Sequence, residues 1–235
     1  AMINTNFAPD IDGLTIRNCT SGRYVFCIFF TTYVYEAKIK NCIFENNEFA
    51  NNAYPPIPDG GGSGVWIANN GIRDDDKEKH LIFEGCTWLN NRVKDNSALK
   101  YGGGFSLGTS LTTKITELEF KSCRFINNFA SERGGGLYLA TSLPVTINNC
   151  LFDGNEAEEG SSIYTETTSN VTIQYTQMVR GKTTSNGAAF IKSSQQLNML
   201  NVTFTENTGG SPNSLYLENE GTAVIENCNF DFTRT

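Results

Sequence analysis

A short residue pattern recurs along this chain, and its period limits the folds that the chain can adopt. In each clear copy an apolar alternation leads to a Cys, an aromatic residue follows two positions later, and an Asn follows three positions after that. The clear copies contain Cys42, Phe44 and Asn47; Cys86, Trp88 and Asn91; Cys123, Phe125 and Asn128; and Cys150, Phe152 and Asn155. Weaker copies contain Thr176 with Met178, Val202 with Phe204 and Asn207, and Cys228 with Phe230, and an early copy ends at Cys19. A fixed period indicates one small structural unit stacked on copies of itself.

The spacing of these anchor residues gives the size of one unit. Anchors at positions 19, 42, 86, 123, 150, 176, 202 and 228 indicate a period of about 26 residues with two longer intervals. We assign the additional residues to insertions at about 50–63, 69–80 and 92–101. Insertions in repeat proteins form loops that often carry binding.

Each unit has a second half, in which small residues precede another apolar alternation, as in 104–107, 136–139 and 162–165. Short alternating segments separated by Asn, Gly, Ser and Thr indicate strands and turns, and no helical period lies between them. The sequence therefore predicts an all-β solenoid, a single-stranded parallel β-helix of about seven to eight coils, as one domain over residues 1–235. We read the chain as a piece of a longer protein, because it opens on Ala1-Met2 and stops soon after a strand-like run.

Stacking places equivalent residues of successive coils in columns. We expect an interior thiol column of Cys19, Cys42, Cys86, Cys123, Cys150 and Cys228, with Thr176 and Val202 as replacements of similar size. Beside it we expect an interior aromatic column of Phe44, Trp88, Phe125, Phe152, Met178 and Phe204. A turn ladder of Asn47, Asn91, Asn128, Asn155 and Asn207 would satisfy backbone groups through its carboxamides and tolerate left-handed conformations.

Both polar columns have chemical alternatives. The thiols could form disulfides or bind a metal, and the asparagines could bind calcium. We prefer packing for the thiols, because side chains at one position of successive coils point the same way, and Cys is a commonly buried residue. We prefer capping for the asparagines, because amides alone are weak calcium ligands. No metal and no cofactor are expected, and Cys27 lies off the thiol column.

The paired pattern Phe-x-x-Asn and Gly-Gly-x-apolar resembles the repeat of the polymorphic membrane protein family. The matching segments are 44–47, 125–128, 152–155 and 204–207, with Gly135-Gly136-Leu137 and Gly103-Gly104-Phe105 as partners. The resemblance implies a right-handed β-helix related in fold to pectate lyases, and usually an adhesive role on a bacterial or protist surface, in virulence among other settings. The chain departs from the pattern at Ser161-Ser162, Pro212-Asn213 and 176–181.

An outward-facing aromatic stripe is the main candidate for ligand binding. If Val65 and Ile67 point inward, Trp66 points outward. We expect the matching outward positions to be Ser106, Tyr138, Tyr164, Ile191 and Tyr216, of which Trp66, Tyr138, Tyr164 and Tyr216 are the proposed ligand contacts. Flat sugar rings or a partner protein could lie there. The alternative is the opposite strand parity, or ordinary exposed strand aromatics.

No catalytic constellation is evident. Glu45 and Asp153 are equivalent positions three coils apart, too far for paired carboxylate chemistry. His80 has no evident Ser or Cys partner, and we read Asp74 to Asp76 as a solvated charge run rather than a cation site. The net charge of −7 argues against nucleic acid, and no apolar run is long enough to span a bilayer.

These observations favour a non-enzymatic adhesin or interaction module, at a cell surface or secreted, that binds a protein or a glycan through its solenoid face and insertion loops. Further domains of the parent chain are expected as partners. The alternatives are a carbohydrate-active β-helix lyase or hydrolase and a structural spacer. Of three glycosylation sequons, the one at Asn170 lies in a turn and is the best acceptor in a eukaryotic secretory setting.

Overall fold

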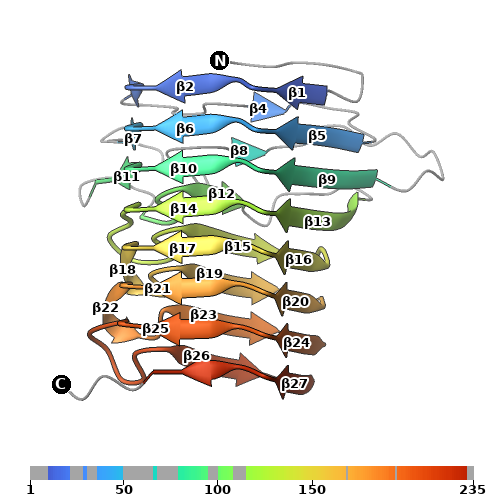
Figure 1. Ribbon diagram of the computed structural model, residues 1–235, viewed down its shortest axis with the longest axis vertical. Helices are drawn as coiled ribbons and strands as arrows, with labels where there is room; N and C mark the ends of the chain where they lie inside the picture. The colour runs from blue at the N-terminus through green and yellow to red at the C-terminus, as the bar shows by residue number, and fades with distance from the viewer. Residues whose placement is uncertain are drawn as a thin grey trace, which may run out of the picture.

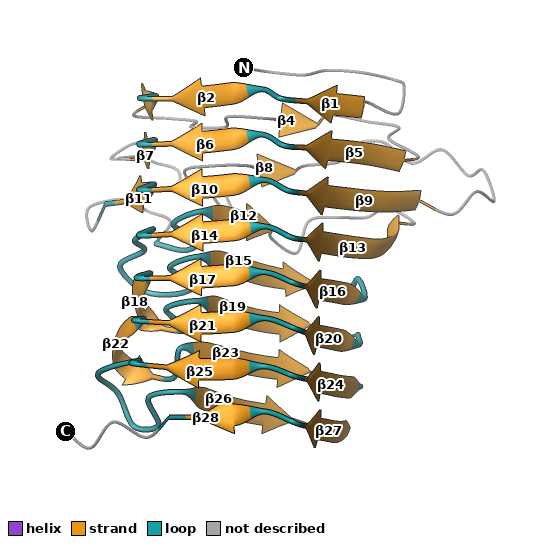
Figure 2. Ribbon diagram, in the orientation of Figure 1, coloured by secondary structure: helices purple, strands orange, loops and turns teal. Residues whose placement is uncertain are grey.

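The computed structural model describes residues 10–21, 29–30, 36–49, 66–67, 79–94, 100–107, 115–167, 169–193 and 195–231. Within these ranges the chain forms 28 strands and no helix. The strands lie in parallel rungs stacked along one axis, with β1 (Asp10–Asp12) at one end of the stack and β27 (Thr222–Glu226) at the other (Figure 1). In the lower half of the stack, where nearly all of the chain is described, turns and loops connect the strands of one rung (Figure 2).

Two eight-stranded parallel sheets run the length of the stack. The first sheet contains β1 (Asp10–Asp12), β5 (Glu36–Lys40), β9 (Lys79–Glu84), β13 (Ile115–Lys121), β16 (Val145–Asn148), β20 (Val171–Gln174), β24 (Gln196–Leu200) and β27 (Thr222–Glu226). The second contains β2 (Thr15–Arg17), β6 (Ile43–Glu45), β10 (Thr87–Leu89), β14 (Arg124–Ile126), β17 (Leu151–Asp153), β21 (Gln177–Val179), β25 (Thr203–Thr205) and β28 (Asn229–Phe230).

The third face carries a five-stranded sheet of β12 (Phe105–Leu107), β15 (Leu137–Thr141), β19 (Ile163–Thr167), β23 (Ala189–Ser193) and β26 (Leu215–Asn219). Smaller sheets are formed by β3 (Thr20–Ser21), β7 (Glu48–Phe49) and β11 (Arg92–Val93), by β18 (Glu156–Glu159) and β22 (Lys182–Asn186), and by β4 (Phe29–Phe30) and β8 (Trp66–Ile67). The strand segments that were predicted after the small-residue runs therefore form this third sheet.

The predicted β-helix is confirmed, with a small difference in the number of coils. The first rung begins with β1 and the last is formed by β27 and β28. Between these two end rungs lie about six turns of about 26 residues each. The prediction of seven to eight coils counted the end rungs as coils.

The core is a column of aromatic rings stacked along the solenoid axis. Trp88 lies on Phe125 with ring centroids 4.5 Å apart, and Phe125 lies on Phe152 at 4.6 Å. Phe44 stacks on Trp88 from the other side at 5.2 Å, and all four side chains are fully buried. Each stacked pair adds about 0.5–1.5 kcal/mol to the stabilisation from burial. The predicted aromatic column is therefore the centre of the fold.

The strand register corrects the predicted place of Cys19. Thr15 pairs with Ile43, so Leu14 and not Cys19 stands in the column of Cys42. Cys19 lies five residues later, in the column of Asn47, and its N–H donates to Asn47 Oδ1 at 3.0 Å. The short early copy resembles the repeat in sequence, but the apolar alternation of Leu14 and Ile16 sets its register.

The predicted insertions fall largely on residues outside those described. Of 50–63 none is described, and of 69–80 only Lys79 and His80 are, both in β9. Of 92–101, Arg92 and Val93 form β11, and Tyr101 makes a parallel bridge with Arg133. Cys27 and Asp74 to Asp76 also lie outside the described residues.

Candidate functional site

The asparagine ladder (Asn47, Asn91, Asn128, Asn155 and Asn207) is a chain of hydrogen bonds along the corner after the second sheet. The Asn91 N–H donates to Asn128 Oδ1 at 3.0 Å, and the Asn128 N–H donates to Asn155 Oδ1 at 2.9 Å. Asn128 Nδ2 donates to the Trp88 carbonyl at 3.0 Å. The ladder side chains are 0–1% exposed. Buried carboxamides thus satisfy corner backbone groups, and the capping role is confirmed.

The left-handed backbone belongs to the residue before each ladder position, which corrects the prediction. Asn46, Asn90 and Asn127 have φ between 52° and 54°, whereas the ladder asparagines are not among the residues with positive φ. The carboxamide of the left-handed residue points away from the core, because Asn46, Asn90 and Asn127 are exposed. Adjacent asparagines therefore have different roles, one conformational and one as a hydrogen-bonding partner.

Two departures from the repeat compensate for each other. Gly181 occupies the ladder position between Asn155 and Asn207, and Ser161 occupies the position of Gly103 and Gly135. A Cβ atom on Gly181 would lie 2.4 Å from Ser161 Oγ. The Ser161 side chain therefore fills the space that an Asn at 181 would need. The Gly181 N–H still donates to Asn207 Oδ1, at 2.8 Å.

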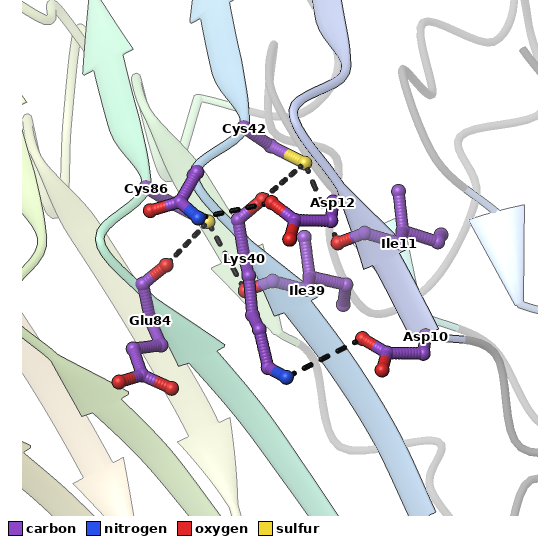
Figure 3. A network of polar contacts seen from close by, with 9 residues as sticks. Asp10, Ile11, Asp12, Ile39, Lys40, Cys42, Glu84 and Cys86 are labelled. Atoms are coloured by element: carbon purple, nitrogen blue, oxygen red, sulfur yellow. Dashed lines mark hydrogen bonds and ion pairs between the residues drawn. The ribbon is translucent and has the colours of Figure 1, made fainter.

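The thiol column, now Cys42, Cys86, Cys123, Cys150 and Cys228, has a hydrogen-bonding role besides packing (Figure 3). Cys42 Sγ donates to the Lys40 carbonyl at 3.1 Å, and Cys86 Sγ donates to the Ile39 carbonyl at 3.2 Å. Thr176 reproduces this pattern, because its Oγ1 donates to the Gln174 carbonyl at 2.9 Å. The thiols close the corner between the first and second sheets.

The chemistry of these thiols fits a buried structural column. Burial raises the pKa of the Cys42 thiol to about 11, and burial also raises the pKa of the Cys123 thiol well above its usual value. The hydrogen bond from Cys123 lowers the pKa of Cys86. All six cysteines within the described ranges are free. Among those ranges no group of three or more His, Cys, Asp or Glu side chains could hold a metal ion.

The outer surface of the third sheet carries a second aromatic cluster outside the core. Ser106, Tyr138, Tyr164, Phe190 and Tyr216 pair in register along this face. Phe190 therefore takes the outward position that was predicted for Ile191, and Ile191 is fully buried in the core. The side chain of Trp66 lies outside the described residues.

The rings of this cluster form a continuous stack, the outer aromatic stack. Its members are Tyr101, Tyr138, Tyr164, Phe190 and Tyr216, with successive ring centroids 4.8, 5.5, 4.6 and 4.7 Å apart. Tyr101 stacks on Tyr138 on the side where the smaller Ser106 pairs with Tyr138 in the sheet. The turn glycines lie against the stack, since a Cβ on Gly134 would be 2.8 Å from Tyr138 Cβ.

The expectation of an exposed aromatic platform is wrong for the middle of the stack. Tyr138 is 6% exposed and Tyr164 is 3% exposed, because each ring face is covered by the next ring. The Arg133 guanidinium lies 5.0 Å from the Tyr164 ring centroid and 5.6 Å from that of Tyr101. Burial raises the pKa of Tyr138 to about 12 and raises that of Tyr164 further. Tyr101 and Tyr216, at the ends, remain partly exposed.

Charged side chains border the outer aromatic stack on both sides. Arg133 Nε donates to Glu159 Oε2 at 3.3 Å on one side. On the other side Lys192 Nζ lies 3.7 Å from Glu166 and 3.3 Å from Glu218. Glu166 and Glu218 are exposed at the side chain, so this alternating row faces solvent. The sequence did not indicate that Arg133 covers the tyrosine rings, because Arg133 lies outside the strand alternation, directly before three glycines.

The carboxylates considered for catalysis are distributed over several sites. The register confirms that Glu45 and Asp153 share a column with Leu89 and Ile126 between them. Asp153 accepts a hydrogen bond from Arg180 Nε at 2.8 Å. Glu156 and Glu158 line a cavity of about 230 Å3 together with Lys182. His80 Nδ1 lies 3.7 Å from Glu117.

The sequon at Asn170 lies at an exposed position before β20, and Asn170 Oδ1 accepts a hydrogen bond from the Gln196 N–H at 3.2 Å. Asn18 and Asn201, in the other two sequons, have left-handed backbones with φ of 55° and 54°. Glycosylation at Asn170 remains a prediction. Within the described chain there is no helix of the length and apolarity needed to cross a membrane.

Comparison with known protein families gives one match. A family model described as a right handed beta helix region matches residues 1–174 and, in an overlapping match, residues 121–230. No curated protein and no solved structure matches the chain significantly. The narrower resemblance to the polymorphic membrane protein repeat remains a prediction.

Proposed function

The chain belongs to the right-handed β-helix family, and we propose that it is a non-enzymatic interaction module. In this proposal the solenoid is a rigid support, and its outer surface binds a protein or a glycan on a cell surface. The proposed location is the cell surface or the extracellular space. The β-helix fold occurs in enzymes and in adhesins alike, so the proposal depends on the surface of this chain and not on the fold.

The outer aromatic stack is the observation that carries the proposal. The core of a solenoid is closed by its interior columns, yet this chain places a second cluster of large rings on the outside of the third sheet. The end rings, Tyr101 and Tyr216, are held by stacking, so they lose little further conformational entropy when a partner covers them, which favours affinity. Aromatic and arginine side chains are also those most enriched at the centres of protein interfaces.

The accessible parts of this surface favour a protein partner there. The faces of Tyr138 and Tyr164 are covered by neighbouring rings, so a sugar ring cannot stack on them. The contacts would come from the partly exposed Tyr101 and Tyr216 and from the row of Glu166, Lys192 and Glu218. Alternating charges of this kind set the register and specificity of an interface more than its affinity.

The test is binding of the full chain to cultured epithelial cells and to an immobilised glycan array. Lys192→Glu should weaken cell binding at least tenfold, because it converts the row into three adjacent acidic side chains. Lys40→Glu is the matched control, since Lys40 has a similar exposure and lies 3.7 Å from Asp10 in the first sheet. Binding that neither substitution changes would reject the third face as the contact surface.

The two rival functions give different results in the same experiment. A carbohydrate-active enzyme would release unsaturated or reducing sugar ends from polysaccharides, and that result would overturn the non-enzymatic proposal. A spacer would bind neither cells nor glycans, which would overturn the interaction proposal as well.

A further inference from the structure

The corner between the first and second sheets has one residue that does not fit its position. In every rung the corner residue has a left-handed backbone, and the residues are Gly13, Asn41, Gly85, Ser122, Asn149, Tyr175, Asn201 and Asn227. Glycine and asparagine adopt this conformation at little cost, whereas a bulky aromatic residue is an outlier there. Tyr175 has φ of 51°, and its side chain is 54% exposed.

The fold gives no reason for a tyrosine at this corner. The corner joins β20 to β21 (Figure 1). The Tyr175 N–H donates to the Leu200 carbonyl at 2.9 Å, and in the preceding rung the Asn149 N–H donates to the Gln174 carbonyl in the same way. Any residue provides that N–H. A strained backbone that presents an exposed ring is the kind of outlier that points to function rather than to folding.

Carboxamide side chains occupy most of the register positions around Tyr175, and Leu200, which pairs with Gln174, and Leu151, which pairs with Gln177, occupy two others. Asn149 and Asn201 are the corner residues of the rungs on either side. Gln174 and Asn148 are neighbours on the first sheet, and Gln177 begins the adjacent strand of the second sheet. Thr203 pairs with Gln177 and adds a hydroxyl group. We name Tyr175 and the six polar residues the carboxamide corner.

The carboxamide corner has no charged member, in a chain whose net charge is −7. The first charged residues along its columns are Lys121, Arg124 and Glu226, each two rungs from Tyr175, and Lys121 pairs with Asn148 at the edge of the corner. Asp153 and Arg180, at the far end of β17 and β21, form an ion pair with each other. A charged ligand would therefore find no counter-charge beside Tyr175.

Several of these side chains have free hydrogen-bonding capacity. Within the described part of the chain, the carboxamides of Gln174, Gln177 and Asn201 make no hydrogen bond. Asn149 Nδ2 donates to Ser122 Oγ at 3.0 Å, which leaves its oxygen without a bond to another described residue. Each carboxamide has two donors and an acceptor, so it can pair with two neighbouring hydroxyl groups of one molecule.

From this combination we infer that the carboxamide corner binds an uncharged oligosaccharide. The exposed Tyr175 ring offers an apolar surface for the C–H face of a sugar ring, and the surrounding carboxamides match hydroxyl groups as donors and acceptors. The inference goes beyond the proposed function, because it uses a different surface from the third face and names a ligand class for it.

The substitution Tyr175→Asn tests this inference, because it installs the residue found at four other corners. It relieves the backbone outlier, so the thermal midpoint of the full chain should stay the same or rise. Its affinity for the oligosaccharide should fall at least tenfold. Loss of binding in a variant that is no less stable cannot come from misfolding. Gln177→Ala should weaken binding three- to tenfold, and Asn41→Gly, at the equivalent corner four rungs away, should leave it unchanged.

The probes are cellohexaose, mannohexaose and chitohexaose, with hexagalacturonate as the acidic control, titrated calorimetrically into the 235-residue chain. The inference predicts saturable binding of at least one uncharged hexasaccharide and none of hexagalacturonate. Absence of binding by all three, or full binding by Tyr175→Asn, overturns it. Cell binding that depends on Lys192 but not on Tyr175 would leave the proposed function standing without this site. Oligosaccharide binding without cell binding would leave the site standing without the proposed cell-surface role.

Discussion

Removing one carboxamide of the asparagine ladder should destabilise the protein far more than removing its neighbour. In Asn128→Ala the Asn91 N–H loses its acceptor and is left buried, at a cost of about 2 kcal/mol. The bonds from Asn128 Nδ2 to the Trp88 carbonyl and to Asn155 Oδ1 are also lost, at about 1 kcal/mol each. The free energy of unfolding should therefore fall by about 4 kcal/mol, a large share of the 5–15 kcal/mol typical of a domain.

The assay is a urea titration followed by far-ultraviolet circular dichroism, with Asn127→Gly as the matched control. Asn127 is exposed and has φ of 52°, and Gly154 occupies its column one rung further on. Glycine adopts a left-handed backbone without strain, so the unfolding free energy of the control should lie within about 0.5 kcal/mol of that of the parent. A loss below about 1 kcal/mol in Asn128→Ala, or equal losses in both variants, would refute the assignment of different roles to adjacent asparagines.

Three further predictions follow from the same contacts. Gly181→Asn should cost about 2 kcal/mol in unfolding free energy by crowding Ser161, and the additional change Ser161→Gly should recover most of it; no recovery in thermal melts would refute the compensation. Thr176→Cys should change the unfolding free energy by less than about 1 kcal/mol. Thr176→Val should lower it by about 2 kcal/mol more than Thr176→Cys does, because the Cys150 N–H loses its acceptor. Equal melting temperatures of the two variants would count against the corner hydrogen bonds. Burial raises the pKa of Tyr138 to about 12 from its usual 10.0, so the unfolded state loses this proton first and stability should fall as the pH rises from 10 to 12. The loss in unfolding free energy reaches about 2.7 kcal/mol above pH 12 and about 1.4 kcal/mol at pH 11. Tyr138→Phe should reduce this loss when urea titrations at pH 9 and pH 11 are compared; an unchanged pH dependence would contradict the burial of the hydroxyl group.

The interior of the solenoid could be predicted because it depends on residues repeated at one period. Phe125 and Phe152 lie in the same column since nearly equal numbers of residues separate equivalent positions in successive coils. The same argument placed Cys123 and Cys150 in the core and Asn128 in a ladder of turn residues. Where the repeat weakens, the prediction fails. Cys19 was assigned to the wrong column because Leu14 and Ile16 were aligned with the strand before Cys42, whereas they occupy the positions of Cys42 and Phe44.

The outer surface could be predicted only in part. Alternation placed Tyr138 and Tyr164 on the outside of the third sheet, and the structure agrees. The accessibility of these two rings depends on the neighbouring rungs and on Arg133. The alternation of residues along a strand gives no information about such contacts. Tyr175 was passed over for a related reason. In the sequence it belongs to a weak copy of the repeat, and only the backbone shows that the position of Tyr175 has a left-handed φ.

By itself the sequence determined the repeat, the absence of a helical period and the identity of the interior columns. These features follow from local strand alternation and from the rule that equivalent residues stack when identical units repeat. Only the tertiary structure decided which outward side chains are covered, which asparagine in each pair is buried, and which residues from different rungs surround Tyr175. Those facts depend on contacts between residues about one period apart in the chain. Such contacts form only when successive coils pack against each other in the folded protein.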